Sequence, residues 1–187
     1  MICSCFIALV LAASGPRSSP LADIGPAPST VLVDSAGKTF DLASLRGKVV
    51  LVSFVYTTCT GVCPGTTQAM ARIQQALKEA KLWGTSVAFV SITLDPKRDE
   101  PETLSRYARL FGADPAAWHF LTGTPEQVEP VIAGWGMWAK SDVTGVIDHP
   151  SRIFLLDRQG HEREIYSLEF LKSESVLQDM RGLLAEK

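Results

Sequence analysis

VVLVSFVYTTCTGVCP, residues 49–64, is the stretch that decides the fold of this chain. Its first eight residues, 49–56, are apolar and rich in β-branched side chains, which is typical of a strand buried on both faces of a sheet. A polar turn with Cys59 and Cys63 follows directly, and a helical pattern begins after Pro64. Binding sites in open α/β sheets gather at the carboxyl ends of the strands, so the two thiols are the candidate functional centre.

Strand and helix patterns alternate along the rest of the chain. They predict, in order, a hairpin, the central strand and its helix, two further strand–helix units, a second hairpin and a closing helix. Asp99 is placed to cap the helix expected over 100–111, and 136–147 is expected to be irregular. This order predicts the α/β class and resembles the thioredoxin plan: a thioredoxin-like fold with a central mixed sheet flanked by helices and an N-terminal β-hairpin extension.

The N-terminal part of the chain differs in composition from the rest. Residues 1–14 have the apolar length and small-residue end of a signal peptide, and they are too short to span a bilayer. Residues 15–28 are rich in Pro, Ser, Gly and Ala and predict a flexible linker, so the domain is expected over 29–187. We therefore expect an exported protein, in a bacterial periplasm or at the periplasmic face of the inner membrane. Removal of the leader would remove Cys3 and Cys5.

The bulk composition excludes some functions. The 187 residues have a formal net charge of −2, which gives no electrostatic basis for binding nucleic acid. The hydrophobic content of 46% and the charged content of 20% are those of an ordinary folded domain.

The spacing of the two cysteines bears on their chemistry. Cys63 lies near the predicted helix N-terminus, where free N–H groups and the helix dipole favour a thiolate. A thiolate pair serves either dithiol–disulfide exchange or a soft metal. Disulfide oxidoreductases mostly have two intervening residues, so the three residues after Cys59 favour the wider bite of a metal site, although a disulfide remains compatible. Copper accepts thiolate and imidazole, whereas a structural zinc site would need four protein ligands, which the sequence does not offer.

Three histidines are candidates for a third ligand. His119 falls in a short predicted strand and is expected to pack there, and His161 follows a turn and is expected to face solvent. His149 comes just before a strand, in a loop that faces the redox turn of thioredoxin-like folds, and Asp148 could orient its ring. On the residues alone, His149 is either functional or an ordinary loop histidine.

Several blocks of the sequence resemble one known family. YTTCTGVCP (56–64) resembles the signature of the Sco/SenC family, the copper proteins that help to assemble cytochrome c oxidase. SITLDPKRDEP (91–101) and LTGT (121–124) resemble its second and third blocks, and Asp148 with His149 falls where the family has its Asp-His pair. The blocks occur in the family's order and spacing.

This resemblance implies a site and its cofactor. Cys59, Cys63 and His149 would bind copper, as Cu(I) or Cu(II). Asp95 would lie near the site as a carboxylate that does not bind the metal, and Asp148 would stand beside the ligand histidine.

The implied function is a copper metallochaperone, and therefore not primarily an enzyme. It would bind one copper and deliver it during maturation of the CuA site of cytochrome c oxidase. Its partners would be the apo copper subunit of the oxidase, or another copper recipient, and a thiol–disulfide reductant, close to a membrane and without nucleic acid.

Two alternatives stay open. A thiol–disulfide oxidoreductase that keeps the copper-site cysteines of a target reduced would use Cys59 and Cys63 as a redox-active pair and would not need His149. A peroxidase of the peroxiredoxin kind shares the fold, but it needs an arginine near one cysteine, and residues 57–60 match its turn only in part.

Overall fold

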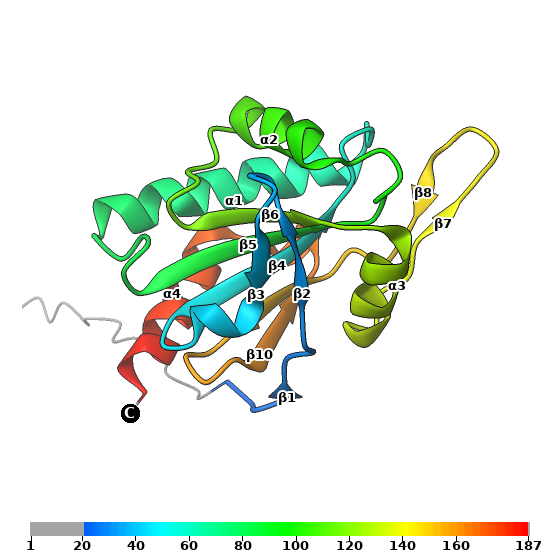
Figure 1. The fold of residues 1–187 in the computed structure, drawn as a ribbon. Helices are drawn as coiled ribbons and strands as arrows, with labels where there is room; N and C mark the ends of the chain where they lie inside the picture. Colours follow the sequence, from blue (N-terminus) through cyan, green and yellow to red (C-terminus); the bar gives the residue numbers. More distant parts are fainter. Residues whose placement is uncertain (1–20, 187) are drawn as a thin grey trace, which may run out of the picture.

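The structure is a computed structural model, of which residues 21–186 are described (Figure 1). The predicted leader, with Cys3 and Cys5, lies outside the described residues. The strands are β1 (Gly25–Pro26), β2 (Val31–Asp34), β3 (Thr39–Asp41), β4 (Val49–Val55), β5 (Val87–Thr93), β6 (Trp118–Thr122), β7 (Lys140–Ser141), β8 (Ile147–Asp148), β9 (Ile153–Leu156) and β10 (His161–Tyr166). The helices are α1 (Val62–Glu79), α2 (Pro101–Leu110), α3 (Pro125–Gly134) and α4 (Ser173–Ala185), with two short 3-10 helices, η1 (Leu42–Leu45) and η2 (Leu168–Phe170).

Eight of the strands form one mixed sheet in the order β1-β10-β9-β4-β5-β6-β2-β3. Strands β4, β5 and β6 run parallel in its centre, β9 runs antiparallel to β4, and the β2–β3 hairpin joins β6 on the other side. Every residue of β4 and β5 is buried, as expected for strands covered on both faces. The predicted α/β class, the mixed sheet and the N-terminal hairpin extension are confirmed.

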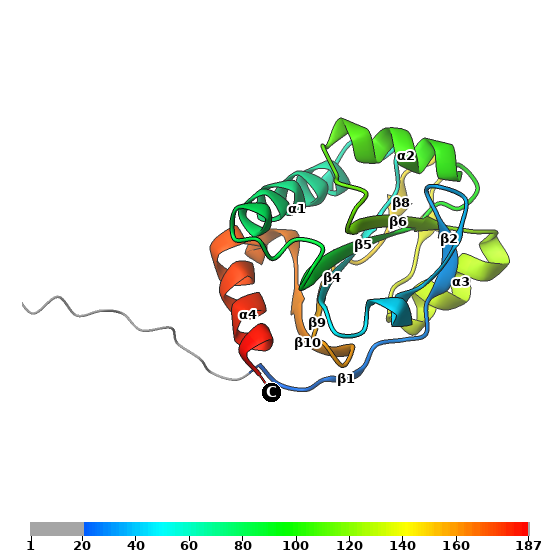
Figure 2. The same ribbon diagram turned by 60° about the vertical axis from the view of Figure 1, so that its left-hand side comes forward.

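Helices cover both faces of this sheet. Figure 2 shows α1, α2 and α4 on one side and α3 on the other. Tyr107 of α2 contacts Phe120 of β6, with 6.1 Å between the ring centroids. On the opposite face, Trp135, which ends α3, packs edge-on against Phe54 of β4 and Phe154 of β9. Apolar packing therefore covers both faces of the sheet. The ends of the strands are left as the places where polar chemistry can occur.

Two predictions about the first half of the chain are corrected. Gly25–Pro26, assigned to the linker 15–28, forms β1, because its backbone pairs with β10 at the sheet edge. Helix α1 begins at Val62, before Pro64, because a proline in the first helical turn costs no hydrogen bond. Cys63 therefore lies inside the helix.

Two predictions about the second half are corrected as well. Asp99 does not cap α2, since Glu100 is the cap residue and Asp99 is fully buried. The segment 136–147 is not wholly irregular, because β7 and β8 pair in a short antiparallel hairpin. Within residues 21–186, no helix has the length and apolar character needed to cross a lipid bilayer.

The topology brings three distant segments to one end of the sheet. The turn after β4 and the turn after β5 meet there because the two strands are parallel and in register from Val49 and Val87 to Val55 and Thr93. Strand β9 begins at the same end because it is antiparallel to β4. The loop between β8 and β9 is therefore next to the cysteine turn.

Candidate metal centre at the carboxyl end of the central strands

The centre combines a turn, a helix start and a distant loop. Cys59 lies in the turn after β4, and Cys63 lies in the first turn of α1. His149 comes from the loop between β8 and β9. Its Nε2 is 3.9 Å from the sulfur of Cys63, although 86 residues separate the two in the chain.

The imidazole of His149 is oriented by its own loop. Nδ1 is 2.9 Å from the carbonyl oxygen of Pro150, and a carbonyl can only accept, so the ring donates its N–H there. Nε2 is left as the lone-pair nitrogen that faces Cys63, as metal-binding histidines require. The ring of Tyr56 meets the imidazole edge-on, with 5.9 Å between centroids. A hollow of about 10 Å³ lies beside Cys63 and His149.

The spacing of Cys63 and His149 suits shared metal ligation. Metal–sulfur and metal–nitrogen bonds of about 2.3 and 2.1 Å, at an angle of about 110–120°, place the two ligand atoms roughly 3.6–3.8 Å apart. The observed 3.9 Å between Sγ and Nε2 is close to this range. Two thiolates and one imidazole are soft and borderline ligands, a set that suits copper.

The sulfur of Cys59 lies on the more exposed side of the centre. It accepts a hydrogen bond from the backbone N–H of Gly61 at 3.4 Å, and it is also hydrogen-bonded by Tyr56 and Cys63. Both cysteines are free thiols in the structure. Within residues 21–186, no three Cys, His, Asp or Glu side chains are gathered closely enough to form a complete metal cage.

The two thiols differ strongly in acidity. Burial of Cys63, which is 2% exposed, raises the pKa of its thiol to about 12, and the neighbouring Cys59 adds to this. Burial also acts to raise the pKa of Cys59, but hydrogen bonds from Tyr56, Cys63 and Gly61 outweigh it and hold the pKa below its usual value. Cys59 is thus the thiol that ionises first.

This order reverses the prediction that the helix N-terminus favours a thiolate at Cys63. The reason is that the side chain of Cys63 is buried, so the loss of hydration outweighs the helix dipole. The free N–H groups of the helix start reach the sulfur of Cys59 instead.

Two residues that sequence reasoning did not assign to the site support it. Asp99 accepts hydrogen bonds from the Thr57 hydroxyl at 2.6 Å, from the Thr57 backbone N–H at 3.2 Å and from the Thr93 hydroxyl at 2.7 Å. It thereby ties the start of the cysteine turn to the end of β5. Tyr56 touches both Cys59 and His149. The only sequence indication was their position within the two blocks at 56–64 and 91–101.

The two predicted carboxylates differ in their surroundings. Asp95 is buried and forms an ion pair with Arg98. Asp148 is exposed and does not orient the imidazole, because the alternation along β8 turns Ile147 inward and Asp148 outward. The ring of His149 is held by Pro150 instead.

The other two histidines lie outside the centre. His119 packs against Phe40, with 4.5 Å between ring centroids, and burial lowers the pKa of its imidazole. His161 is paired with Asp23 at the far end of β10.

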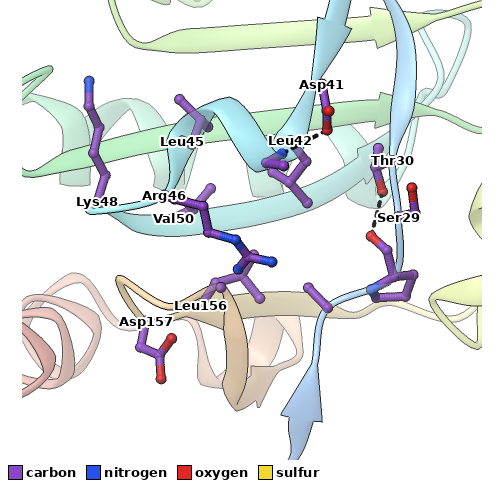
Figure 3. A pocket seen from close by; sticks show the side chains of 14 residues that line it. Ser29, Thr30, Asp41, Leu42, Leu45, Arg46, Lys48, Val50, Leu156 and Asp157 are labelled. Carbon is purple, nitrogen blue, oxygen red and sulfur yellow. Dashed lines mark hydrogen bonds between the residues drawn. The ribbon is translucent and has the colours of Figure 1, made fainter.

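A separate hollow of about 250 Å³ lies at the opposite end of β4 (Figure 3). Figure 3 shows the guanidinium of Arg46 pointing into the space beside Leu156. Arg46 already donates to the carbonyl of Gln159, and Lys48 on the rim donates to the carbonyl of Gly84. This hollow is not part of the cysteine–histidine centre.

Comparison with known proteins assigns the chain to a family. The SCO1/SenC family model matches residues 27–185, which is almost all of the described chain. The chain belongs to the SCO1/SenC family. The resemblance noted in the four sequence blocks is therefore confirmed.

Individual SCO proteins are similar over most of the chain. A SCO2-like protein of Rickettsia prowazekii is 30% identical over 149 residues, which cover 76% of this chain and 70% of the relative. The mitochondrial SCO2 homolog of Homo sapiens is 30% identical over 145 residues, covering 72% of this chain and 51% of the relative.

Solved structures of SCO proteins share the fold. A SCO1/SenC family lipoprotein from Bacillus anthracis superposes with a TM-score of 0.78 at 30% identity, covering 86% of this chain and 95% of that structure. Bradyrhizobium japonicum ScoI, solved with copper bound, gives a TM-score of 0.72 at 30% identity, covering 84% and 99%.

Proposed function

We propose that this SCO protein is a copper metallochaperone. It binds one copper through the sulfurs of Cys59 and Cys63 and through Nε2 of His149, and it delivers that copper during maturation of the CuA site of cytochrome c oxidase. The observation that carries the proposal is the 3.9 Å approach of His149 Nε2 to the Cys63 sulfur, with the ring oriented by Pro150 so that its lone pair faces the thiol.

The relatives support copper as the cargo. ScoI of B. japonicum, 30% identical to this chain, has been solved with copper bound. BsSco, which shares this fold, is described as a member of the Sco family of cytochrome c oxidase assembly proteins. The donor set of two sulfurs and one imidazole is selective for copper over harder ions.

The difference between the two cysteines gives the transfer a direction. Cys63 is buried, whereas Cys59 is partly exposed and is the more acidic thiol. A recipient's own thiols or imidazoles would meet the copper from the side of Cys59. Cys63 and His149 would release it last. Both thiols must be reduced for loading, so copper binding depends on a thiol reductant.

The proposal is tested by copper loading of the full chain with Cys3 and Cys5 replaced by serine, so that only the two site thiols remain. Under anaerobic conditions, the parent protein should bind one copper per chain and show a thiolate-to-copper(II) absorption band. Cys59→Ser and His149→Ala should each lose the band. His161→Ala is the matched control and should keep it, because His161 lies at the far end of β10. Wild-type copper binding by His149→Ala would contradict the three-ligand site.

A second candidate function is dithiol–disulfide exchange, which the contrast in thiol acidity favours. Cys59, with its lowered pKa, would attack a target disulfide, and the target's leaving sulfur would depart as a thiolate. Cys63 would then displace the second target thiolate from the mixed disulfide and leave a Cys59–Cys63 disulfide. His149→Ala should keep this activity in full, whereas Cys59→Ser should abolish it, as measured by reduction of a small aromatic disulfide.

We also propose that the protein acts after export, at the periplasmic face of the inner membrane, in contact with the apo copper subunit of the oxidase or another copper recipient. The similarity to a family lipoprotein supports this location. Cell fractionation with antibody detection tests it, and recovery in the cytoplasmic fraction alone would contradict it.

A further inference from the structure

A hairpin arm connects the distant histidine to the rest of the centre. We define the arm as residues 138–148, which include β7 and β8, and Figure 1 shows it projecting from the body of the protein. The carboxylate of Asp142 closes its tip by accepting hydrogen bonds from the backbone N–H groups of Thr144 and Val146 and from the Thr144 hydroxyl. The arm leads directly into His149, so its position fixes where the imidazole can lie.

The underside of the arm is largely unsupported. A groove of about 460 Å³ separates it from α3 and from the turn after β5. The floor of the groove is apolar and includes Val128 and Ile132 of α3. Val143 and Val146, near the tip, are exposed. Apolar packing therefore holds the arm at its root, where Ile147 is buried and Ala139 packs on the core, and not at its tip.

One arginine bridges the groove. Arg98, in the turn after β5, donates from Nε to the carboxylate of Asp95 and from Nη2 to the carbonyl oxygen of Gly145 at 2.9 Å. Asp95 is itself buried, so its carboxylate is an immobile acceptor for the guanidinium. The planar fork of arginine can serve both acceptors at once, which the single ammonium of a lysine cannot do with the same geometry.

Residue 145 is matched to this contact. Gly145 has a φ of +85°, a backbone conformation that side chains with a Cβ rarely adopt. A Cβ at this position would lie 2.9 Å from Nη1 of Arg98, closer than real Cβ contacts. The absence of a side chain at Gly145 therefore allows the backbone of the arm to approach the guanidinium of Arg98 closely.

The arm meets the centre again at its root. Burial raises the pKa of Tyr56, and the backbone of Ile147 lies close enough to the Tyr56 hydroxyl to act against this rise. Tyr56 also contacts Cys59 and His149. A shift of the arm at Gly145 would consequently move Ile147, and with it His149, relative to the sulfurs. The arm is thus attached both near its tip and at its root.

We propose that Arg98 is a positioning residue for the metal centre: by joining Asp95 to Gly145 it holds the hairpin arm in the place that brings His149 to the cysteines. The effect of Arg98 on copper binding rests on the proposed function. The fixing of the arm by Arg98 concerns the metal-free protein alone.

Arg98→Ala and Lys97→Ala test the proposal in the full chain. Lys97 is the matched control, because it is the neighbouring cation of the same turn and makes no hydrogen bond or ion pair with residues 21–186. In metal-free Arg98→Ala, the amide of Ile147 should exchange its hydrogen about ten-fold faster, the change expected for loss of a hydrogen bond to a charged group. Copper(II) affinity should fall about ten-fold, the lower limit for residues that orient metal ligands. Lys97→Ala should leave both quantities unchanged.

Gly145→Ala disturbs the same contact from the side of the arm. It should reproduce both effects, and the double variant with Arg98→Ala should show no additional change, because the two residues act through one hydrogen bond. Wild-type exchange at Ile147 or wild-type copper affinity in Arg98→Ala would overturn the proposal. If the unmodified protein bound no copper, the proposed function would fail, while the exchange of Ile147 would still report on the arm.

Discussion

The two cysteines of the candidate centre differ in burial and in acidity. Cys63 is almost fully shielded from water, which raises the pKa of its thiol, whereas hydrogen bonds to the partly exposed Cys59 lower the pKa of that thiol. Asp99 supports the cysteine turn from inside the protein. It is fully buried, and its carboxylate accepts a hydrogen bond from Thr57 at the start of the turn. The geometry of the centre therefore depends on a carboxylate that touches neither sulfur.

Asp99 should make stability depend on pH in a specific direction. Burial raises the pKa of its carboxyl group above the usual value, despite the opposing hydrogen bonds from Thr57 and Thr93. The folded state consequently keeps the proton to higher pH than the unfolded state does. From about pH 4 up to the folded pKa, the contribution of this group to the free energy of unfolding should fall as pH rises.

Asp99→Asn should remove this pH dependence, because the asparagine does not titrate. Urea unfolding between pH 4 and pH 7 measures it, with Glu102→Gln as a surface control that should keep the slope of the parent protein. A slope in Asp99→Asn equal to that of the parent would show that another group causes it.

Buried hydroxyls connect the three parallel strands beneath the centre. The hydroxyls of Ser53 on β4 and Ser91 on β5 are 2.8 Å apart, and the indole N–H of Trp118 on β6 donates to Ser91 at 3.0 Å. Ser91 is the middle member and serves both neighbours. These polar side chains fix the register of strands that are otherwise apolar on both faces.

Ser91→Ala should therefore destabilise the protein more than Ser53→Ala. Loss of Ser91 leaves two buried groups unpaired, the Ser53 hydroxyl and the Trp118 N–H, at a cost of about 2–3 kcal/mol. Loss of Ser53 leaves the bond between Trp118 and Ser91 intact and should cost about 1 kcal/mol. Denaturant unfolding of both variants measures the difference, and equal costs would exclude the linking role of Ser91.

The sequence was informative about long elements and less so about short ones. Strands β4 and β5 were predicted because seven consecutive buried residues leave an unmistakable apolar pattern. The start of α1 was missed because Pro64 is tolerated in the first turn. The β7–β8 hairpin was missed because strands of two residues have no periodicity.

The candidate site was predictable only in part, for a physical reason. The cysteine turn is local in sequence, and its position after a buried strand indicated it directly. The acidity of its thiols depends on burial by other segments, so the expected thiolate at Cys63 was wrong. The contacts of Arg98 with Gly145 and of Asp99 with Thr57 join residues more than 40 positions apart, and no local pattern indicates them.

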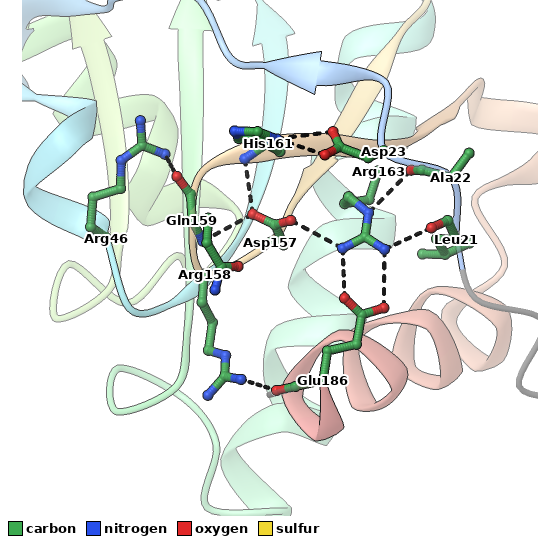
Figure 4. A network of polar contacts seen from close by, with 10 residues as sticks. All are labelled: Leu21, Ala22, Asp23, Arg46, Asp157, Arg158, Gln159, His161, Arg163 and Glu186. Atoms are coloured by element: carbon green, nitrogen blue, oxygen red, sulfur yellow. Dashed lines mark hydrogen bonds and ion pairs between the residues drawn. The ribbon is translucent and has the colours of Figure 1, made fainter.

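The two ends of the described chain are joined on the side away from the metal centre (Figure 4). Arg163 of β10 forms a two-pronged ion pair with Glu186, just after α4, and also pairs with the buried Asp157 at 3.0 Å. The same guanidinium donates to the backbone carbonyls of Leu21 and Ala22. One side chain therefore fastens the first described residues, the β9–β10 turn and the end of α4.

Arg163→Met should destabilise the whole fold. It leaves the carboxylate of Asp157 buried without its charged partner, with only the backbone N–H groups of Gln159 and His161 still donating to it, for which a cost of about 3 kcal/mol is expected. Arg106→Met removes a comparable ion pair with Glu102 on the surface of α2 and should cost less than about 1 kcal/mol. Unfolding by guanidinium chloride distinguishes them. Copper binding by folded Arg163→Met should remain at the level of the parent protein, and a cost no larger than that of Arg106→Met would contradict the fastening role.

The most direct test of the copper site is X-ray absorption at the copper edge on the loaded full chain, with Cys3 and Cys5 replaced by serine. We predict scattering from two sulfurs and one imidazole in the parent protein, and loss of the imidazole contribution in His149→Ala but not in His161→Ala. A copper environment without sulfur, or an imidazole contribution that persists in His149→Ala, would contradict it.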